Sequence, residues 1–228
     1  MRATVVLSAV GILALWLAFQ HKPGWYRPAV LDEPTLRRAR SESVATADQV
    51  SDRLVKREAF ELTLTDRSVN EWLAALPELW PETRDAWPPE LSQPAVRFGE
   101  GTVRLGVHFE YEGWRAIIGV SLSVGVSADG QSLTVKLNAA SGGSLPAPRT
   151  LLDRILDPQL DRLSRRRDAR GQPHDIWASS LAKVRSTADL YDGVTVRNRF
   201  IWFNGRRPFR IAAIEVGGGE LRLRIEPM

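Results

Sequence analysis

The chain opens with a predominantly apolar run that precedes every other pattern. Ala3 to Phe19 is interrupted only by Thr4 and Ser8, and polarity returns abruptly at Gln20. A helix that crosses the hydrocarbon core of a bilayer needs about 20 such residues, with roughly 17 as the lower limit. The run has no polar face, which argues against a core helix of a soluble domain. It predicts a transmembrane helix over residues 1–21.

Two interpretations of this run are a permanent anchor and a cleaved secretory signal. The run ends in Leu15-Trp16-Leu17-Ala18-Phe19, with bulky residues where a signal peptidase requires small ones, so an uncleaved anchor is favoured. The chain has no cysteine, which excludes a lipoprotein signal. Basic residues flank both ends almost equally. Very short N-terminal tails usually stay in the cytoplasm, so we expect a single-pass protein of the cytoplasmic membrane with its bulk extracytoplasmic.

Between the anchor and residue 94, the pattern predicts a stalk, two helices and one strand. Pro23, Gly24 and Pro28 make residues 22–34 a short, stiff stalk. Apolar residues recur at helical spacing in two segments, and apolar and polar residues alternate strictly in the segment between them. The predicted elements are a helix over Thr35–Lys56, a strand over Phe60–Leu64, a helix over Asp66–Leu76 and a loop over Pro77–Pro94.

The centre of the chain alternates between apolar and polar residues, as β-strands with one buried face do. Three such strands are predicted, over Val103–Tyr111, Ala116–Val126 and Leu133–Ala139, with Asp129-Gly130 in the second turn. Residues 114–127 would extend over about 45 Å at roughly 3.3 Å per residue. A flat sheet of that length cannot be hidden in a small domain. It must coil around another element or expose its apolar face to a ligand.

The element available for such coiling follows directly. Leucine and isoleucine recur at helical spacing from Leu151 to Leu163, and charged residues lie on the other side. A second helical segment, Asp175–Lys183, and three C-terminal strands complete the chain; the strands span Val194–Phe203, Phe209–Val216 and Glu220–Pro227. The predicted fold class is therefore α+β: a long coiled antiparallel β-sheet wrapped around an amphipathic helix, preceded by an N-terminal transmembrane helix. Residues 35–228 form a single domain.

The charge of the chain indicates a membrane as a partner and argues against nucleic acid as one. The 31 Lys and Arg exceed the 27 Asp and Glu by four, and the charges are interspersed. Mild basicity beside an anchor indicates attraction to anionic lipid headgroups, and no nucleic-acid-binding motif accompanies it. The run Arg165, Arg166 and Arg167 is a candidate membrane-surface contact. A favourable interaction with the C-terminal end of a helix dipole explains it equally well.

Candidate chemistry is sparse. Three histidines lie far apart and there is no cysteine, so neither a metal site nor a cofactor is expected. Glu110 and Glu112 share a strand face, but a solvated face is the simpler explanation. Ser144 follows two glycines without the G-x-S-x-G pattern of a nucleophile turn, and the prolines around it indicate a structural loop. We therefore expect a protein that is not an enzyme.

Several of these elements together are similar to a known family. The segment LTDRSVNEWL with Asn70, the Asp129-Gly130 hairpin and the GSLPAPRTLLDRIL junction resemble the YpmS-like, membrane-anchored proteins of unknown function. The likeness covers roughly Phe60 to Leu156 and is one of pattern. It implies an extracytoplasmic domain of coiled sheet around a helix, similar to the tubular lipid-binding superfamily, whose members hold acyl chains between sheet and helix. This chain departs from the family in having an anchor without a lipidated cysteine and in its arginine run.

The pattern and the resemblance lead to two expectations about function. The first is a membrane-anchored module that binds or shields an apolar ligand such as lipid. The second is a scaffold that binds another envelope protein through the helix over Thr35–Lys56. In the first case the candidate lining residues are Val120, Leu122, Val124, Val135 and Leu137 of the sheet with Leu152, Ile155 and Leu156 of the helix. An ordinary core is the competing explanation for each of these positions.

Overall fold

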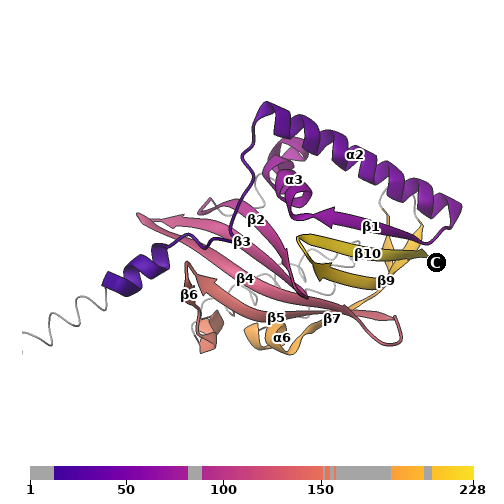
Figure 1. Ribbon diagram of the computed structural model, residues 1–228. Coiled ribbons are helices and arrows are strands. Elements are labelled where there is room, and N and C mark those ends of the chain that lie inside the picture. The colour runs from indigo at the N-terminus through magenta and orange to yellow at the C-terminus, as the bar shows by residue number, and fades with distance from the viewer. Residues whose placement is uncertain (1–12, 82–88, 151, 155–156, 158–185, 203–206) are drawn as a thin grey trace, which may run out of the picture.

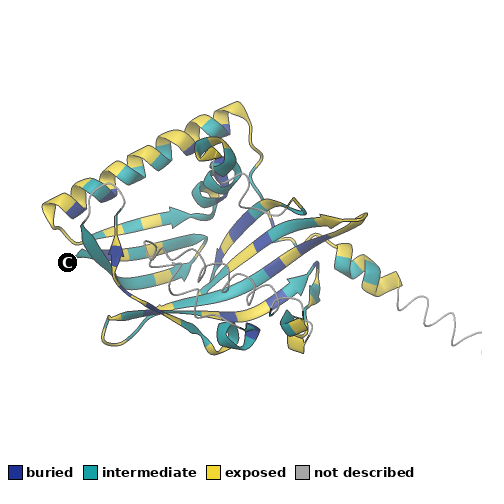
Figure 2. Cartoon of the chain, turned by 180° about the vertical axis from the view of Figure 1, so that it is seen from behind, coloured by how far each residue is buried: buried dark blue, intermediate teal, exposed yellow. Residues whose placement is uncertain are grey.

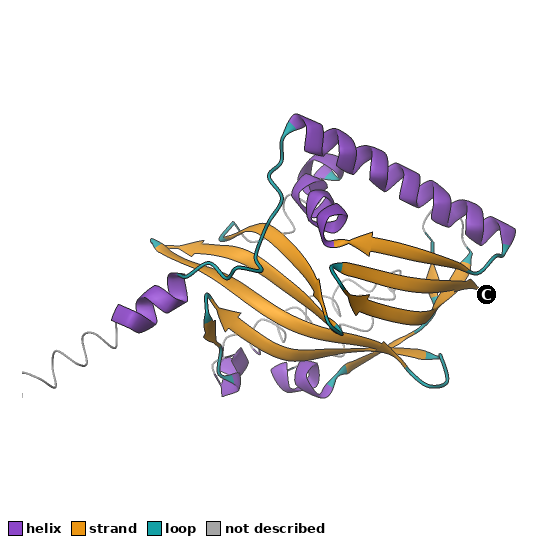
Figure 3. Ribbon diagram, viewed as in Figure 1, coloured by secondary structure: helices purple, strands orange, loops and turns teal. Residues whose placement is uncertain are grey.

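The computed structural model describes residues 13–81, 89–150, 152–154, 157, 186–202 and 207–228 (Figure 1). Two antiparallel sheets and a small number of helices make up this part of the chain, so the predicted α+β class is confirmed. Figure 3 shows that strands dominate and that the helices lie at the periphery of the sheets. Residues 13–20 form a helix at one end of the molecule.

The larger sheet has six strands in the order β2-β3-β4-β5-β6, and β7 pairs with β5. Strands β2 to β6 follow one another along the chain and are connected by tight turns that carry glycine at a positive φ, as at Gly113 and Gly130. The strands span Leu91–Gly99 (β2), Thr102–Tyr111 (β3), Trp114–Val126 (β4), Ser132–Gly142 (β5), Leu145–Pro146 (β6) and Val194–Arg197 (β7). The three strands predicted at the centre of the chain are thus confirmed as β3, β4 and β5.

The smaller sheet brings the two ends of the domain together. Its order is β1-β10-β9-β8, so the strand after the first long helix pairs with the last strand of the chain. The members span Phe60–Thr65 (β1), Phe200–Ile201 (β8), Pro208–Gly217 (β9) and Glu220–Pro227 (β10). A short helix, α6 (Thr187–Asp192), precedes β7 and begins with a capping box at Ser186.

The helix predicted over residues 35–56 is α2 (Glu33–Lys56), and it packs on the smaller sheet (Figure 1). Asp32 caps its N-terminus by accepting a hydrogen bond from the Thr35 amide at 2.8 Å. Val50 and Leu54 pack against Ile225 of β10, and these three residues are at most 3% exposed. Figure 2 shows the result: one buried stripe along α2 and an exposed outer surface.

The segment after α2 differs from the prediction in two places. Helix α3 (Asp66–Leu79) continues through Pro77, and β2 begins at Leu91, inside the region expected to be a loop. The prolines argued against a strand in the sequence, because a proline nitrogen cannot donate a hydrogen bond to a neighbouring strand. In the structure Pro94 lies at a register shift on the edge strand β2, where no ladder bond is required of it.

Two predicted features extend beyond the described residues. Of the helix around which the sheet was expected to coil, residues 152–154 are described as helical and most of the rest lies outside the described residues. The segment Asp175–Lys183 lies outside them entirely. Among the residues that the structure describes, no helix is both long and apolar enough to cross a membrane. Residues 1–12 of the predicted anchor are outside that part of the chain.

Candidate functional site

The apolar residues of β3, β4 and β5 lie on one face of the larger sheet, which we call the apolar face. Registered partners in an antiparallel sheet share a face. Leu105 pairs with Val120, and Val107 pairs with Ile118. The predicted lining residues of the sheet pair in the same way. Leu122 is paired with Leu137 and Val124 with Val135. The structure therefore brings together the five sheet residues that the sequence singled out: Val120, Leu122, Val124, Val135 and Leu137.

The apolar face is covered unevenly. Leu133 and Leu137, on β5, are 2% and 3% exposed. Val120, Leu122, Val124 and Val135 are half-buried. At the other end of the face the exposed fraction rises to 36% for Leu105 and 39% for Ile118. Leu105 on β3 and Ile118 on β4 are diagonal neighbours, and their side chains form an open apolar patch.

The opposite face of the same strands carries small and polar residues, and the stalk covers it around Gly106 and Gly119. We call it the small-residue face. A Cβ atom added at Gly106 would lie 2.7 Å from the Trp25 ring, and one added at Gly119 would lie 3.0 Å from it. Tyr26 is 1% exposed and packs with Ala95 and Ile117.

The alternating pattern predicts that this face meets water, and much of it does: Arg104, Lys136 and Asn138 are exposed. Around Gly106 and Gly119 it does not. Instead, the absence of side chains on the small-residue face lets the indole of Trp25 approach the backbone of the sheet. The stalk is thus part of the fold, and Tyr26 is fixed by a 2.5 Å hydrogen bond from its hydroxyl to the Gln93 carbonyl.

The helix of residues 13–20 lies against the end of the sheet where the apolar face is open. Trp16 meets Trp114 edge to face, with ring centroids 4.6 Å apart. The Phe19 ring lies over Gly142, where an added Cβ would be 2.8 Å from it. The Ser144 amide donates a hydrogen bond to the Ala18 carbonyl at 2.9 Å. The glycine-serine segment that superficially resembles a nucleophile turn is therefore a docking loop for the N-terminal helix.

The remaining predicted site residues are only partly described. Leu152 is half-buried in the helical residues 152–154. Ile155 and Leu156 lie outside the described residues. The same holds for the predicted membrane-surface residues Arg165, Arg166 and Arg167.

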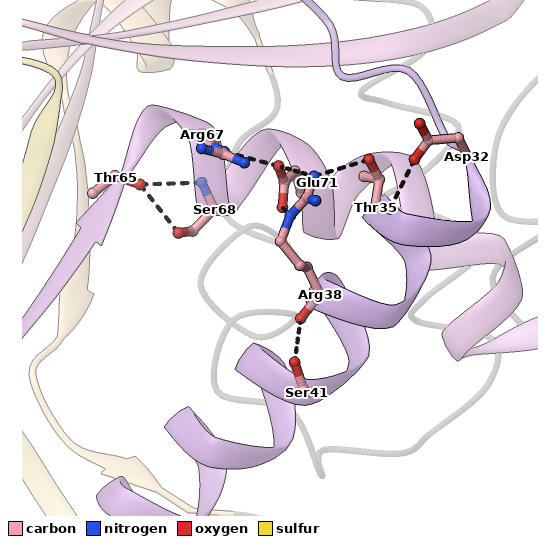
Figure 4. A network of polar contacts seen from close by, with 8 residues as sticks. All are labelled: Asp32, Thr35, Arg38, Ser41, Thr65, Arg67, Ser68 and Glu71. Atoms are coloured by element: carbon pink, nitrogen blue, oxygen red, sulfur yellow. Dashed lines mark hydrogen bonds and ion pairs between the residues drawn. The ribbon is translucent and has the colours of Figure 1, made fainter.

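Sequence reasoning missed the polar cluster that joins α3 to its neighbours (Figure 4). Glu71 is 6% exposed and accepts two hydrogen bonds from Arg38 of α2, at 3.0 and 3.3 Å, and one from Arg67 at 3.0 Å. The hydrogen bonds from Arg38 lower the pKa of Glu71, and Arg67 adds to the effect. Because α2 and α3 both hold this carboxylate, it fixes the angle between the two helices.

Asp66 and Asn70, on the same face of α3, bind the free edge of β2. Asn70 donates to the Val96 carbonyl at 2.9 Å and accepts from the Val96 amide at 2.6 Å, while Asp66 accepts from the Phe98 amide at 2.6 Å. The spacings match, since four helical residues rise about 6 Å and two strand residues about 6.6 Å. The i, i+4 pair of short polar side chains in LTDRSVNEWL is the signal that could have revealed this contact.

A groove of about 700 Å³ lies between the stalk, α3 and β2. Its walls are mainly aliphatic and proline side chains, and its lining includes Val30, Leu31, Leu73, Leu76 and Leu91. The chemistry of this groove also suits an apolar chain. It is separate from the apolar face, because its lining includes none of the residues of that face on β4 and β5.

Acidic and histidine side chains offer little chemistry in the part of the chain that the structure describes. No group of three or more His, Asp or Glu residues there is arranged to hold a metal ion. Glu110 forms an exposed ion pair with Arg115 at 2.9 Å. Comparison with protein-family models, with curated proteins and with solved structures finds no match to this chain.

Proposed function

We propose that this protein is a membrane-anchored, non-enzymatic module that binds or shields an apolar ligand such as lipid on the apolar face of its larger sheet. The observation that carries the proposal is an exposed aliphatic patch on that face. Leu105 and Ile118 stay more than a third exposed, whereas Leu133 and Leu137 of the same face are buried. Aliphatic side chains on an open, curved sheet favour an apolar ligand over water.

The anchoring part of the proposal is supported by the N-terminal segment. The run Ala3–Phe19 has the composition of a membrane span, and Leu13, Leu15 and Leu17 are each more than half exposed. Leu13 and Leu17 share one side of the helix, and Leu15 lies on the opposite side, so no single protein surface would cover all three. Hydrocarbon would cover all of them at once. The body of the chain would then lie on the extracytoplasmic side of the cytoplasmic membrane.

The segment over Leu151–Leu163 has a role in the same proposal. Its apolar stripe would complete a cavity with the sheet, giving the coiled sheet around an amphipathic helix that the resemblance implies. Leu152, which is half-buried, lies at the start of this stripe. An acyl chain held between the two would gain about 0.8 kcal/mol per buried methylene. Ten methylenes give about 8 kcal/mol, the free energy of a micromolar complex before ordering costs.

The test uses the full chain, because the stalk and Phe19 contribute to the fold. Protein purified from membranes and exchanged from detergent into amphipol is analysed by native mass spectrometry for bound lipid. Binding of a fluorescent palmitoyl probe is then measured by titration. We expect stoichiometric lipid or probe, and about tenfold weaker binding when Leu105→Gln and Ile118→Gln remove two aliphatic contacts from the apolar face.

Two further substitutions locate the ligand. Val44, on α2, is 55% exposed and far from the apolar face in sequence and in packing, so Val44→Gln is the matched control and should leave the affinity unchanged. Leu31→Gln alters the groove beside α3. If Leu31→Gln weakens binding and the double variant does not, the ligand lies in the groove and the proposed face is wrong. Absence of any lipid or probe binding would leave the envelope scaffold as the better interpretation.

A further inference from the structure

The end of the β3–β4 hairpin carries two large aromatic side chains that are half exposed. Tyr111 and Trp114 are partners across the turn, on the apolar face, and their exposed fractions are 50% and 52%. Glu112 and Gly113 between them adopt positive φ values of 48° and 84°, as a tight hairpin turn requires. Tyrosine and tryptophan are the residues enriched where protein meets the polar surface of a bilayer.

This hairpin end is linked directly to the N-terminal helix. The 4.6 Å contact between the rings of Trp16 and Trp114 places both side chains in one environment. Figures 1 and 2, from opposite sides, both show the helix and this end of the sheet on the same side of the molecule. Whatever surrounds the helix therefore also reaches the hairpin.

The depth of the contact follows from the sequence. Trp16 lies three residues, or about 4.5 Å along a helix, before the end of the apolar run at Phe19. A residue one turn inside the end of a span lies at the boundary between hydrocarbon and headgroups. Trp114, in contact with it, lies at the same level. The Glu110–Arg115 ion pair, the register pair next to Tyr111 and Trp114, suits the headgroup layer.

We propose that Tyr111 and Trp114 form a second membrane contact, inserted into the headgroup region of the bilayer that holds the N-terminal helix. This inference rests on the anchoring in the proposed function and goes beyond it. With two contacts the sheet can no longer rotate freely about the anchor. Its open apolar patch at Ile118, four residues from Trp114 along β4, is held next to the lipid surface.

The absence of cysteine makes a direct test available, because one introduced cysteine gives one labelled site. The full chain is reconstituted in nanodiscs of phosphatidylcholine and phosphatidylglycerol, with a nitroxide at Tyr111→Cys, Leu13→Cys or Asp129→Cys. Asp129 belongs to the other hairpin turn of the same sheet and is exposed, so it serves as the control. The measurement is the ratio of the label's accessibility to oxygen and to a water-soluble nickel chelate.

We expect the ratio at position 111 to exceed that at position 129 at least about threefold, as at an interface that admits oxygen and excludes the chelate. Adding Trp114→Ser to the Tyr111→Cys protein should lower the ratio, since the hairpin then loses its remaining aromatic anchor. Equal ratios at 111 and 129, with a hydrocarbon value at 13, would overturn this inference and leave the anchoring intact. An aqueous value at 13 would overturn both. Dipolar broadening at 111 would assign the surface to a second copy of the chain instead.

Discussion

Asn70 offers the sharpest test of how this fold is held together. It lies on α3, it is 7% exposed, and its amide satisfies both backbone groups of Val96 on the edge of β2. Val96 is itself 8% exposed, so water cannot easily replace the lost partner. Asn70→Ala would leave a buried N–H and a buried C=O without partners.

The expected cost follows from these two groups. An unsatisfied buried donor or acceptor costs about 1–3 kcal/mol, so the two groups together should lower the free energy of unfolding of Asn70→Ala by about 2–6 kcal/mol. With a urea m-value of about 2 kcal/mol per molar, the midpoint would fall by roughly 1–3 M. Urea unfolding of the full chain in a mild detergent, followed by far-ultraviolet circular dichroism, measures the change.

A matched control and a second variant make the test specific. Asn138, on β5, is exposed and accepts a 3.3 Å hydrogen bond from Ser123, so Asn138→Ala should cost less than about 0.5 kcal/mol. In Asn70→Asp the protonated carboxyl can still donate to the Val96 carbonyl, whereas the carboxylate cannot. The folded state therefore raises the pKa of that aspartate, and the variant should lose stability as the pH rises above about 4. Losses of equal size at positions 70 and 138 would refute the reasoning.

Three other variants test separate contacts by the same unfolding assay. Because the folded state lowers the pKa of Glu71, its carboxylate stabilises the fold above the usual pKa of 4.5, and this stabilisation is lost as the pH falls through the pKa of the folded state. Glu71→Gln should therefore make the free energy of unfolding less dependent on pH in the acid range. An unchanged dependence on acid pH would contradict the ion cluster. Burial raises the pKa of Tyr26 to about 12, so stability should fall between pH 10 and 12 in the wild type; Tyr26→Phe should lack that fall and cost about 1 kcal/mol at neutral pH for the lost hydrogen bond. Gly143 and Gly101 have φ values of 59° and 62°, but only at Gly143 would a Cβ atom meet the Phe19 carbonyl, 2.1 Å away. Gly143→Ala should therefore lower the free energy of unfolding by about 1–3 kcal/mol more than Gly101→Ala does. Equal losses would argue against docking of the N-terminal helix on this loop.

Local patterns predicted the elements of this protein well. The strands over residues 103–139 and the helix over residues 35–56 were predictable because alternation and helical spacing are properties of neighbouring residues. The register of β4 and β5 then followed from their apolar rows, which is why five candidate lining residues lie together on one face. Asp129-Gly130 likewise predicted its turn from chemistry within four residues.

What the sequence by itself could not determine was which segment covers which face. Only the tertiary structure placed Trp25 over the glycines of the small-residue face, and this buries part of a face that alternation assigns to solvent. The pairing of Asn70 with Val96 was equally hidden, because a hydrogen bond between residues 26 apart leaves no periodic trace. Periodicity shows which residues of a segment share a face, whereas what covers each face depends on contacts between distant parts of the chain. Here those contacts bury part of the polar face and leave Leu105 and Ile118 of the apolar face exposed.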